Sequence, residues 1–96
     1  MLVFHVFFKC RPGKREEFLE KLTSEGVVSA CRGEEGNLSY DYYFPAEDPC
    51  GLLLIEKWKD ADAVARHAKQ PHMARMDALK AAYTEDMRLE AYKADR

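Results

Sequence analysis

The order of strand and helix patterns along this sequence predicts an α+β fold of the ferredoxin-like type, β-α-β-β-α-β, with one antiparallel four-stranded sheet. Four runs have patterns typical of strands: apolar and polar residues alternate, or aromatic and β-branched residues predominate. These runs lie at 2–9, 37–44, 52–58 and 87–92. Helical spacing is found at 14–31 and 60–69, and again after Pro71. No repeat, linker or low-complexity segment interrupts the 96 residues, so we expect a single domain spanning residues 1–96.

The first expected strand, Leu2 to Lys9, is apolar on both of its alternating faces. A strand of this kind is covered on both sides. Helices in so short a chain can cover only one face of a sheet, so the other face needs a second sheet, most simply from another copy. We therefore expect a homodimer, in which His5 finds a partner either in a ligand pocket or across the dimer interface.

The first expected helix, 14–31, carries two glutamates in its first turn, where the helix dipole favours acids. After Gly26 the apolar positions fall out of phase with those before it, which indicates either a kink or a second packing surface. An acidic turn follows. Strict alternation in the next strand predicts one aromatic-rich face, made of Leu38, Tyr40, Tyr42 and Phe44.

The stretch from 55 to 73 joins the third strand to the second helix and gathers the chemically versatile side chains. Alternation places Glu56 and Trp58 on one face of the strand. Asp60 is suited to cap the helix that follows, and helical spacing turns His67 inward. Because Pro71 has no amide donor and restricts the residue before it, the helix should stop near residue 69 and leave His72 beyond its end.

Composition argues against several classes of partner. The net charge is −2 with 33% charged residues, and no basic stripe or polybasic segment is visible, so we expect neither nucleic acid nor a membrane as a partner. The apolar opening, 2–8, is too short to span a bilayer and lacks the features of a leader, so we expect a soluble, cytoplasmic protein. Three widely spaced cysteines argue against both a disulfide framework and a thiolate zinc site.

His67 is the strongest candidate for chemistry. If it meets Glu56 across the sheet, the carboxylate can fix the imidazole tautomer and make a proton shuttle; the alternative is a core histidine satisfied by one hydrogen bond. His67 and His72 are five residues apart rather than four, so they are not a helical metal pair, although Pro71 could let them converge. Too few ligands are evident, and we expect no metal.

Several aromatic residues are either core residues or walls of an apolar cavity for a flat aromatic ligand. These are Trp58, Tyr40 and Tyr42. Met73 belongs to a methionine stripe that is typical of packing, and its position next to His72 would also let it touch a ligand.

Four motifs occur in order along nearly the whole chain: Arg-Pro-Gly-Lys at 11–14, Glu-Gly-Asn-Leu-Ser-Tyr at 35–40, Glu-Lys-Trp-Lys-Asp at 56–60, and His67 followed by Pro-His-Met at 71–73. This pattern resembles the antibiotic biosynthesis monooxygenase domain, and within it most closely the small quinol monooxygenases. The resemblance implies a dimeric α+β barrel in which two four-stranded sheets pack face to face. It also implies oxidation of a hydroquinone by O2 without metal, flavin or nicotinamide.

A related branch of that superfamily binds and degrades haem with an asparagine, a tryptophan and a histidine. Near those positions this sequence has His5, His67 and Asp77, so the resemblance does not extend to haem degradation, although His72 lies nearby.

We therefore expect a monooxygenase that uses O2 and no cofactor on a small quinol or polycyclic aromatic substrate. His67 would be the base, oriented by Glu56, and His72 would hold a substrate oxygen. The remaining candidates would bind substrate: Trp58, His5, Tyr40, Tyr42 and Met73. Two alternatives use the same residues. One is an isomerase or other proton-transfer enzyme on a small carbonyl metabolite, of the autoinducer-processing type; the other is a non-catalytic dimer that binds a small ligand.

Overall fold

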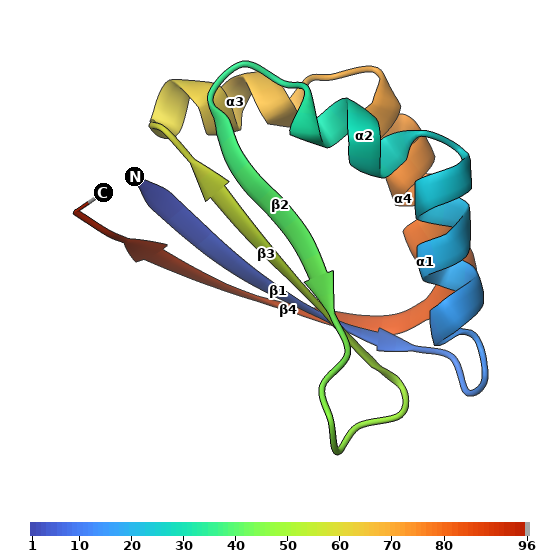
Figure 1. Cartoon of the computed structure of the whole chain (residues 1–96). Coiled ribbons are helices and arrows are strands. Elements are labelled where there is room, and N and C mark those ends of the chain that lie inside the picture. Colours follow the sequence, from blue (N-terminus) through green and yellow to red (C-terminus); the bar gives the residue numbers. More distant parts are fainter. Residues whose placement is uncertain (96) are drawn as a thin grey trace.

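The computed structural model describes residues 1–95; Arg96, the last residue of the expected 1–96 domain, lies outside the described residues. The elements, in chain order, are β1 (Leu2–Cys10), α1 (Arg15–Ser24), α2 (Val27–Arg32), β2 (Asn37–Tyr43), β3 (Gly51–Trp58), α3 (Ala61–Ala68), α4 (His72–Tyr83) and β4 (Thr84–Lys93). The strands form one antiparallel sheet in the order β2-β3-β1-β4, with the helices on one of its faces (Figure 1). The expected ferredoxin-like fold is confirmed, with each helical region divided in two.

The core lies between the sheet and the helices. Val6 of β1 pairs with Leu54 of β3 on one side and with Leu89 of β4 on the other. Alternate residues of β1 from Val6 onward are buried on the helix side, as side-chain alternation requires. The largest fully buried side chains are Trp58, Tyr40, Phe18, Leu22, Leu52 and Leu54.

Gly26 separates the first two helices. Its φ of 82° is in the left-handed region, which glycine adopts without the steric cost that a Cβ would bring. The turn redirects the chain, so that α1 buries Phe18 and Leu22 while α2 buries a separate apolar set, Val27, Val28 and Cys31. The change of apolar phase in the sequence therefore reflects both a break and a second packing surface.

The prediction of one aromatic-rich face along β2 is wrong for its first and last residues, Leu38 and Phe44. Leu38 is 55% exposed, and Phe44 is 47% exposed and lies beyond the strand. At Leu38 the cause is a register shift between Asn37 and Ser39, where an extra residue interrupts the alternation; at Phe44 it is the end of the strand at Tyr43. Beyond this bulge the expected face is recovered, because Tyr40 pairs with Glu56 and is buried.

The junction between α3 and α4 follows the sequence closely. The Asp60 carboxylate accepts a hydrogen bond from the backbone N–H of Ala63 at 2.9 Å, which confirms the expected cap. α3 ends at Ala68, and α4 begins at His72, directly after Pro71. α4 then runs for 12 residues.

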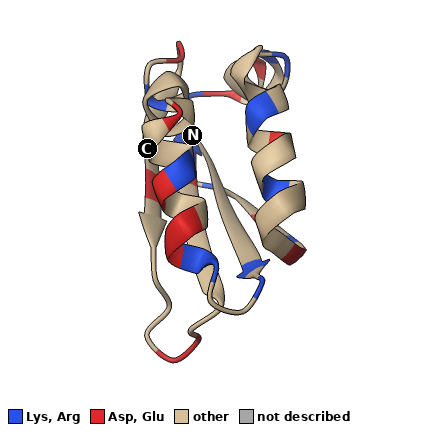
Figure 2. Ribbon diagram, turned by 90° about the vertical axis from the view of Figure 1, so that its right-hand side faces the viewer, with Lys and Arg blue, Asp and Glu red and all other residues tan. Residues whose placement is uncertain are grey.

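The other face of the sheet has no helix over it in the described part of the chain (Figure 1). His5 and Ile55 pair across β1 and β3, and alternation from Val6 and Leu54 turns both of them toward this open face. Acidic and basic residues are interspersed along the helices (Figure 2). None of the helices among residues 1–95 is long and apolar enough to cross a membrane.

Candidate functional site

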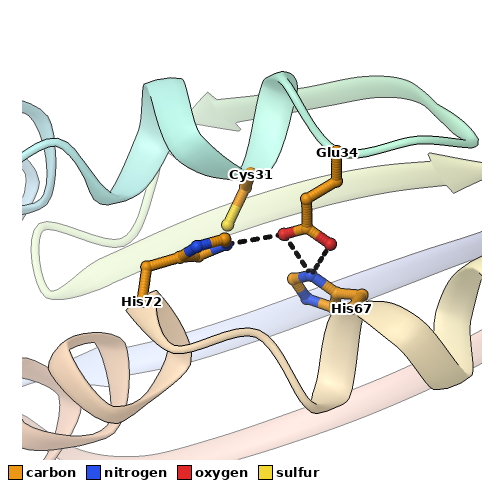
Figure 3. A group of neighbouring side chains, drawn as sticks. All are labelled: Cys31, Glu34, His67 and His72. Carbon is orange, nitrogen blue, oxygen red and sulfur yellow. Dashed lines mark hydrogen bonds and ion pairs between the residues drawn. The ribbon is translucent and has the colours of Figure 1, made fainter.

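Four side chains from separate elements meet at one end of the helical layer (Figure 3). Cys31 comes from the last turn of α2, and Glu34 from the turn that follows it. His67 lies in the last turn of α3, and His72 is the first residue of α4. Because Pro71 ends one helix and allows the next to begin, both imidazoles can face the same carboxylate.

Glu34 bridges the two histidines. Its Oε2 lies 2.9 Å from Nδ1 of His67 and 2.7 Å from Nε2 of His72. The three side chains are 6%, 10% and 21% exposed, respectively. A carboxylate can only accept, so these contacts assign N–H to Nδ1 of His67 and to Nε2 of His72. The two ring orientations are therefore fixed by one buried acid.

Glu56 lies on the other side of His67. Its Oε1 is 3.7 Å from Nε2 of His67, and it accepts a hydrogen bond of 3.0 Å from the indole N–H of Trp58. Burial raises the pKa of the Glu56 carboxyl above its usual range; the Trp58 hydrogen bond and nearby His67 oppose this effect, and Glu34 adds to it. The expected meeting of His67 and Glu56 is thus present, although Glu34 is the closer acid.

Aromatic rings hold His67 in place. The Trp58 ring lies 4.5 Å from the His67 ring, centroid to centroid, and the Tyr40 ring lies 6.3 Å from it. Trp58 is fully buried and Tyr40 nearly so. These two predicted residues therefore pack around the histidine, and Trp58 also orients Glu56.

An apolar pocket of about 170 Å³ opens beside Glu56, between the sheet and α4. Its lining residues are Val6, Phe8, Tyr40, Leu54, Glu56, Met73, Met76, Asp77, Lys80, Met87 and Leu89. Glu56, Tyr40 and Met73, three of the predicted site residues, thus lie on its wall. His67 and His72 are not among its lining residues; His67 contacts Glu56, and His72 contacts Glu34.

The hydroxyls of Tyr40 and Tyr42 are buried and lack a hydrogen-bond partner among residues 1–95. Burial is the main cause that raises the pKa of both phenols, so they are neutral donors at physiological pH. Tyr40 lines the pocket. Its unpartnered hydroxyl is a group that a polar ligand atom could satisfy.

The expectation that His5 lies in the same pocket is wrong. It is on the open face of the sheet, with its ring centroid 5.2 Å from that of Tyr92 in β4. Side chains of β1 alternate between the two faces of the sheet. Val6 and every second residue from it face the helices, whereas His5 faces the other way. The two alternatives for His5 were a ligand pocket and the dimer interface, and its position on the open face agrees with the second.

Glu34 is the member of this cluster that the sequence pattern did not single out. It lies in a turn read only as acidic, and its partner His67 is 33 positions away. The glycine at position 36 was the one sequence signal for this turn. Its φ is 86°, and a Cβ there would lie 2.5 Å from the Cβ of Ala63. A glycine two residues after Glu34 thus allows the turn to approach α3 closely.

The four residues of Figure 3 also have the composition of a transition-metal site. One donor atom from each lies within 4.8 Å of the others. However, Glu34 lies at hydrogen-bond distance from both imidazoles, whereas two ligands on one zinc ion are separated by ~3.3 Å or more. Burial raises the pKa of the Cys31 thiol to about 12. The geometry is that of a hydrogen-bonded group.

Comparisons with known proteins agree with this architecture. The sequence model of the family described as antibiotic biosynthesis monooxygenase matches residues 1–79. "Putative monooxygenase YcnE" of Bacillus subtilis is 36% identical over 72 residues, which cover 75% of this chain and 74% of the relative.

Solved structures with the same fold cover nearly the whole chain. The structure of PA3566 from Pseudomonas aeruginosa superposes with a TM-score of 0.84 at 25% identity, covering 97% of this chain and 92% of the other. A "putative antibiotic biosynthesis monooxygenase" from Nitrosomonas europaea gives a TM-score of 0.87 at 24% identity with both chains fully covered, a likeness that concerns the fold.

Proposed function

The chain belongs to the antibiotic biosynthesis monooxygenase family, and from this premise we propose that it oxidises a small quinol with O2 and without a bound cofactor. The observation that carries the proposal is the place of Glu56. It is a buried carboxylate on the wall of an apolar pocket, and behind it His67 and Glu34 form a continuous chain of acid and base groups.

The size of the pocket favours a small substrate. A dry protein cavity of ~150 Å³ accepts benzene, and the pocket here has about 170 Å³. One aromatic ring therefore fills most of this volume, and a second fused ring exceeds it. We thus favour a single-ring hydroquinone over the polycyclic class.

The first step is removal of a proton. A hydroquinone gives an electron to O2 more readily after one hydroxyl has ionised. Two acids line the pocket: the Glu56 side chain is 12% exposed, whereas that of Asp77 is 69% exposed and lies 3.7 Å from Nζ of Lys80, so Glu56 is the buried acid available to the substrate. Its raised pKa makes it a stronger base than an exposed glutamate, which suits general-base catalysis near neutral pH. The unpartnered Tyr40 hydroxyl donates to the phenolate oxygen that forms.

The proton then leaves the pocket through His67. With N–H on Nδ1, this histidine presents the lone pair of Nε2 to Glu56, and the imidazolium formed by transfer is stabilised by Glu34. His72 holds Glu34 from the other side. The expected roles are therefore exchanged: Glu56 is the base that contacts the substrate, and His67 accepts the proton from Glu56.

Oxidation requires no further reductant. The substrate supplies all the electrons: C₆H₆O₂ and O2 give C₆H₄O₃ and water, so one oxygen atom enters the ring and the other leaves as water. The apolar wall keeps solvent away from the reacting ring. Val6, Phe8 and Leu54 form its base.

We also propose that the protein acts as a homodimer through the open face of the sheet. This face carries His5 and Phe7 of β1 and Ile55 of β3, two strands whose other face packs on the helices. A second sheet would cover them.

The test is oxygen uptake by metal-free protein with a panel of hydroquinones, run in air and under nitrogen. We expect turnover only in air, and a loss of ~10²-fold or more in Glu56→Gln. His5→Gln, on the opposite face, is the matched control and should retain activity. Turnover of a carbonyl metabolite without oxygen would favour the isomerase instead, and tight binding without any turnover would favour a ligand-binding protein.

A further inference from the structure

Two cysteines face each other where β1 ends and β3 begins. The register of the two strands ends with the pair of Lys9 and Gly51, and Cys10 and Cys50 are the residues directly beyond that pair. The backbone N–H of Cys10 donates to the carbonyl of Cys50 at 2.7 Å, while the N–H of Cys50 donates to Oδ1 of Asp48 at 3.0 Å, so one ladder-type hydrogen bond joins the two cysteines. In a hydrogen-bonded antiparallel pair the α-carbons lie ~5.5 Å apart, within the range that a disulfide spans.

The Cys10 thiol lies on the helix side of the sheet, and Cys50 is close enough to influence its pKa. Phe8 pairs with Leu52, and both are buried toward the helices. Two residues further along β1, Cys10 returns to that face, and Cys50 directly precedes β3 beside it. Cys10 is fully buried and Cys50 is partly exposed.

We propose that Cys10 and Cys50 form a site of oxidative modification, at which hydrogen peroxide converts the two thiols into a cross-strand disulfide. This site is independent of the quinol reaction. Cys31, the third cysteine, is excluded by its place at the opposite end of the helical layer, beside Glu34 and the histidines.

The chemistry follows the exposure of the two sulfurs. The partly exposed Cys50 attacks the O–O bond as its thiolate, giving a sulfenic acid and a first water. The Cys10 sulfur then attacks the sulfenic sulfur, which forms the S–S bond and releases the second water. Two thiols are oxidised by two electrons in all, and one peroxide is reduced to two waters.

Burial raises the pKa of the Cys10 thiol to about 11, and the neighbouring Cys50 adds to this effect. The second step is therefore the slower one at neutral pH and should accelerate toward alkaline pH.

The surrounding structure favours closure. Arg15 of α1 donates to the backbone oxygen of Asp48 at 3.1 Å and lies over the ring of Phe44 at 4.0 Å, so it holds the loop that carries Cys50. A bond between Cys10 and Cys50 would enclose α1, α2 and β2 in one covalent loop. Such a loop restricts the unfolded chain and should raise the denaturant midpoint of the oxidised protein.

The test is titration of the full, reduced protein with hydrogen peroxide, followed by intact mass and peptide mapping. We expect the loss of two hydrogen atoms, a peptide pair joined through Cys10 and Cys50, full reversal by a dithiol reductant, and the same result in Cys31→Ala. In Cys50→Ser we expect no loss of two hydrogens.

Addition of oxygen atoms to Cys50 without a cross-link would overturn the proposal, as would a bond to Cys31 or between two chains. The wild-type map decides the question even if a variant fails to fold. Because the measurement needs no substrate, it is also separate from the test of oxygen uptake.

Discussion

Gly36→Ala tests whether the turn that carries Glu34 is held against α3 by its lack of a side chain. The φ of Gly36 is 86°, which costs an L-residue ~1–2 kcal/mol. The added Cβ would lie 2.5 Å from the Cβ of Ala63, well inside the usual carbon contact of ~3.5–4 Å, so the turn must withdraw by ~1 Å. Overpacking of this kind costs a further ~1–3 kcal/mol, and we expect a total loss of ~2–5 kcal/mol.

The same shift should affect the site. Withdrawal of the turn lengthens the contact of 2.9 Å between Glu34 and Nδ1 of His67 beyond hydrogen-bond distance. A displacement of ~1 Å in a positioning group can reduce turnover by ~10²-fold. Gly36→Ala should therefore lose oxygen uptake together with stability.

Gly13→Ala is the matched control, because Gly13 also has a positive φ, 74°, but nothing lies within 4 Å of the added Cβ. It should lose only the conformational part, ~1–2 kcal/mol, and keep its activity. Ala63→Gly combined with Gly36→Ala should recover part of the loss by making room. Urea denaturation and oxygen uptake are the assays. Equal losses in the two single variants would refute the steric argument.

Further changes probe the acid and base groups and the open face. The pKa of Glu56 is raised in the folded state, so the folded protein loses stability as this carboxyl ionises. The stability of the wild type relative to Glu56→Gln should therefore fall as pH rises from below the ordinary glutamate range through the raised pKa. Urea midpoints that differ equally at every pH would contradict this. His67→Ala should reduce oxygen uptake by ~10²-fold or more, and His72→Ala by less, since it acts through Glu34; unchanged rates in both would remove the histidines from the mechanism. Dialysis against a chelator should leave uptake unchanged, whereas a loss restored by a divalent ion would assign the residues of Figure 3 to a metal. Ile55→Glu should dissociate the proposed dimer in sedimentation experiments, and a monomeric wild-type protein would refute that assembly.

Local rules sufficed for much of the fold. The cap at Asp60, the inward turn of His67 and the break at Pro71 each depend on a few neighbouring residues, so sequence spacing predicts them. The bulge before Ser39 does not follow from spacing, because alternation on either side of it looks regular. Strict alternation therefore placed Leu38 on the wrong face.

The candidate site was predicted only in part for a similar reason. Glu56 and His67 could be paired because a strand and the next helix bring them together. Glu34 approaches His67 only after α2 and α3 have packed, and that contact depends on the conformation of a turn. The sequence indicated the histidines, while the acid between them emerged from tertiary structure.

The position of β4 has a consequence for how ligand affinity is measured. This strand supplies Met87 and Leu89 to the pocket wall, yet it is an edge strand of the sheet and both side chains are about half exposed. A neighbour that packs along this margin would narrow the pocket opening and bury both residues. Occupancy of the pocket and contact along β4 would then be thermodynamically linked, so the apparent dissociation constant should change with protein concentration.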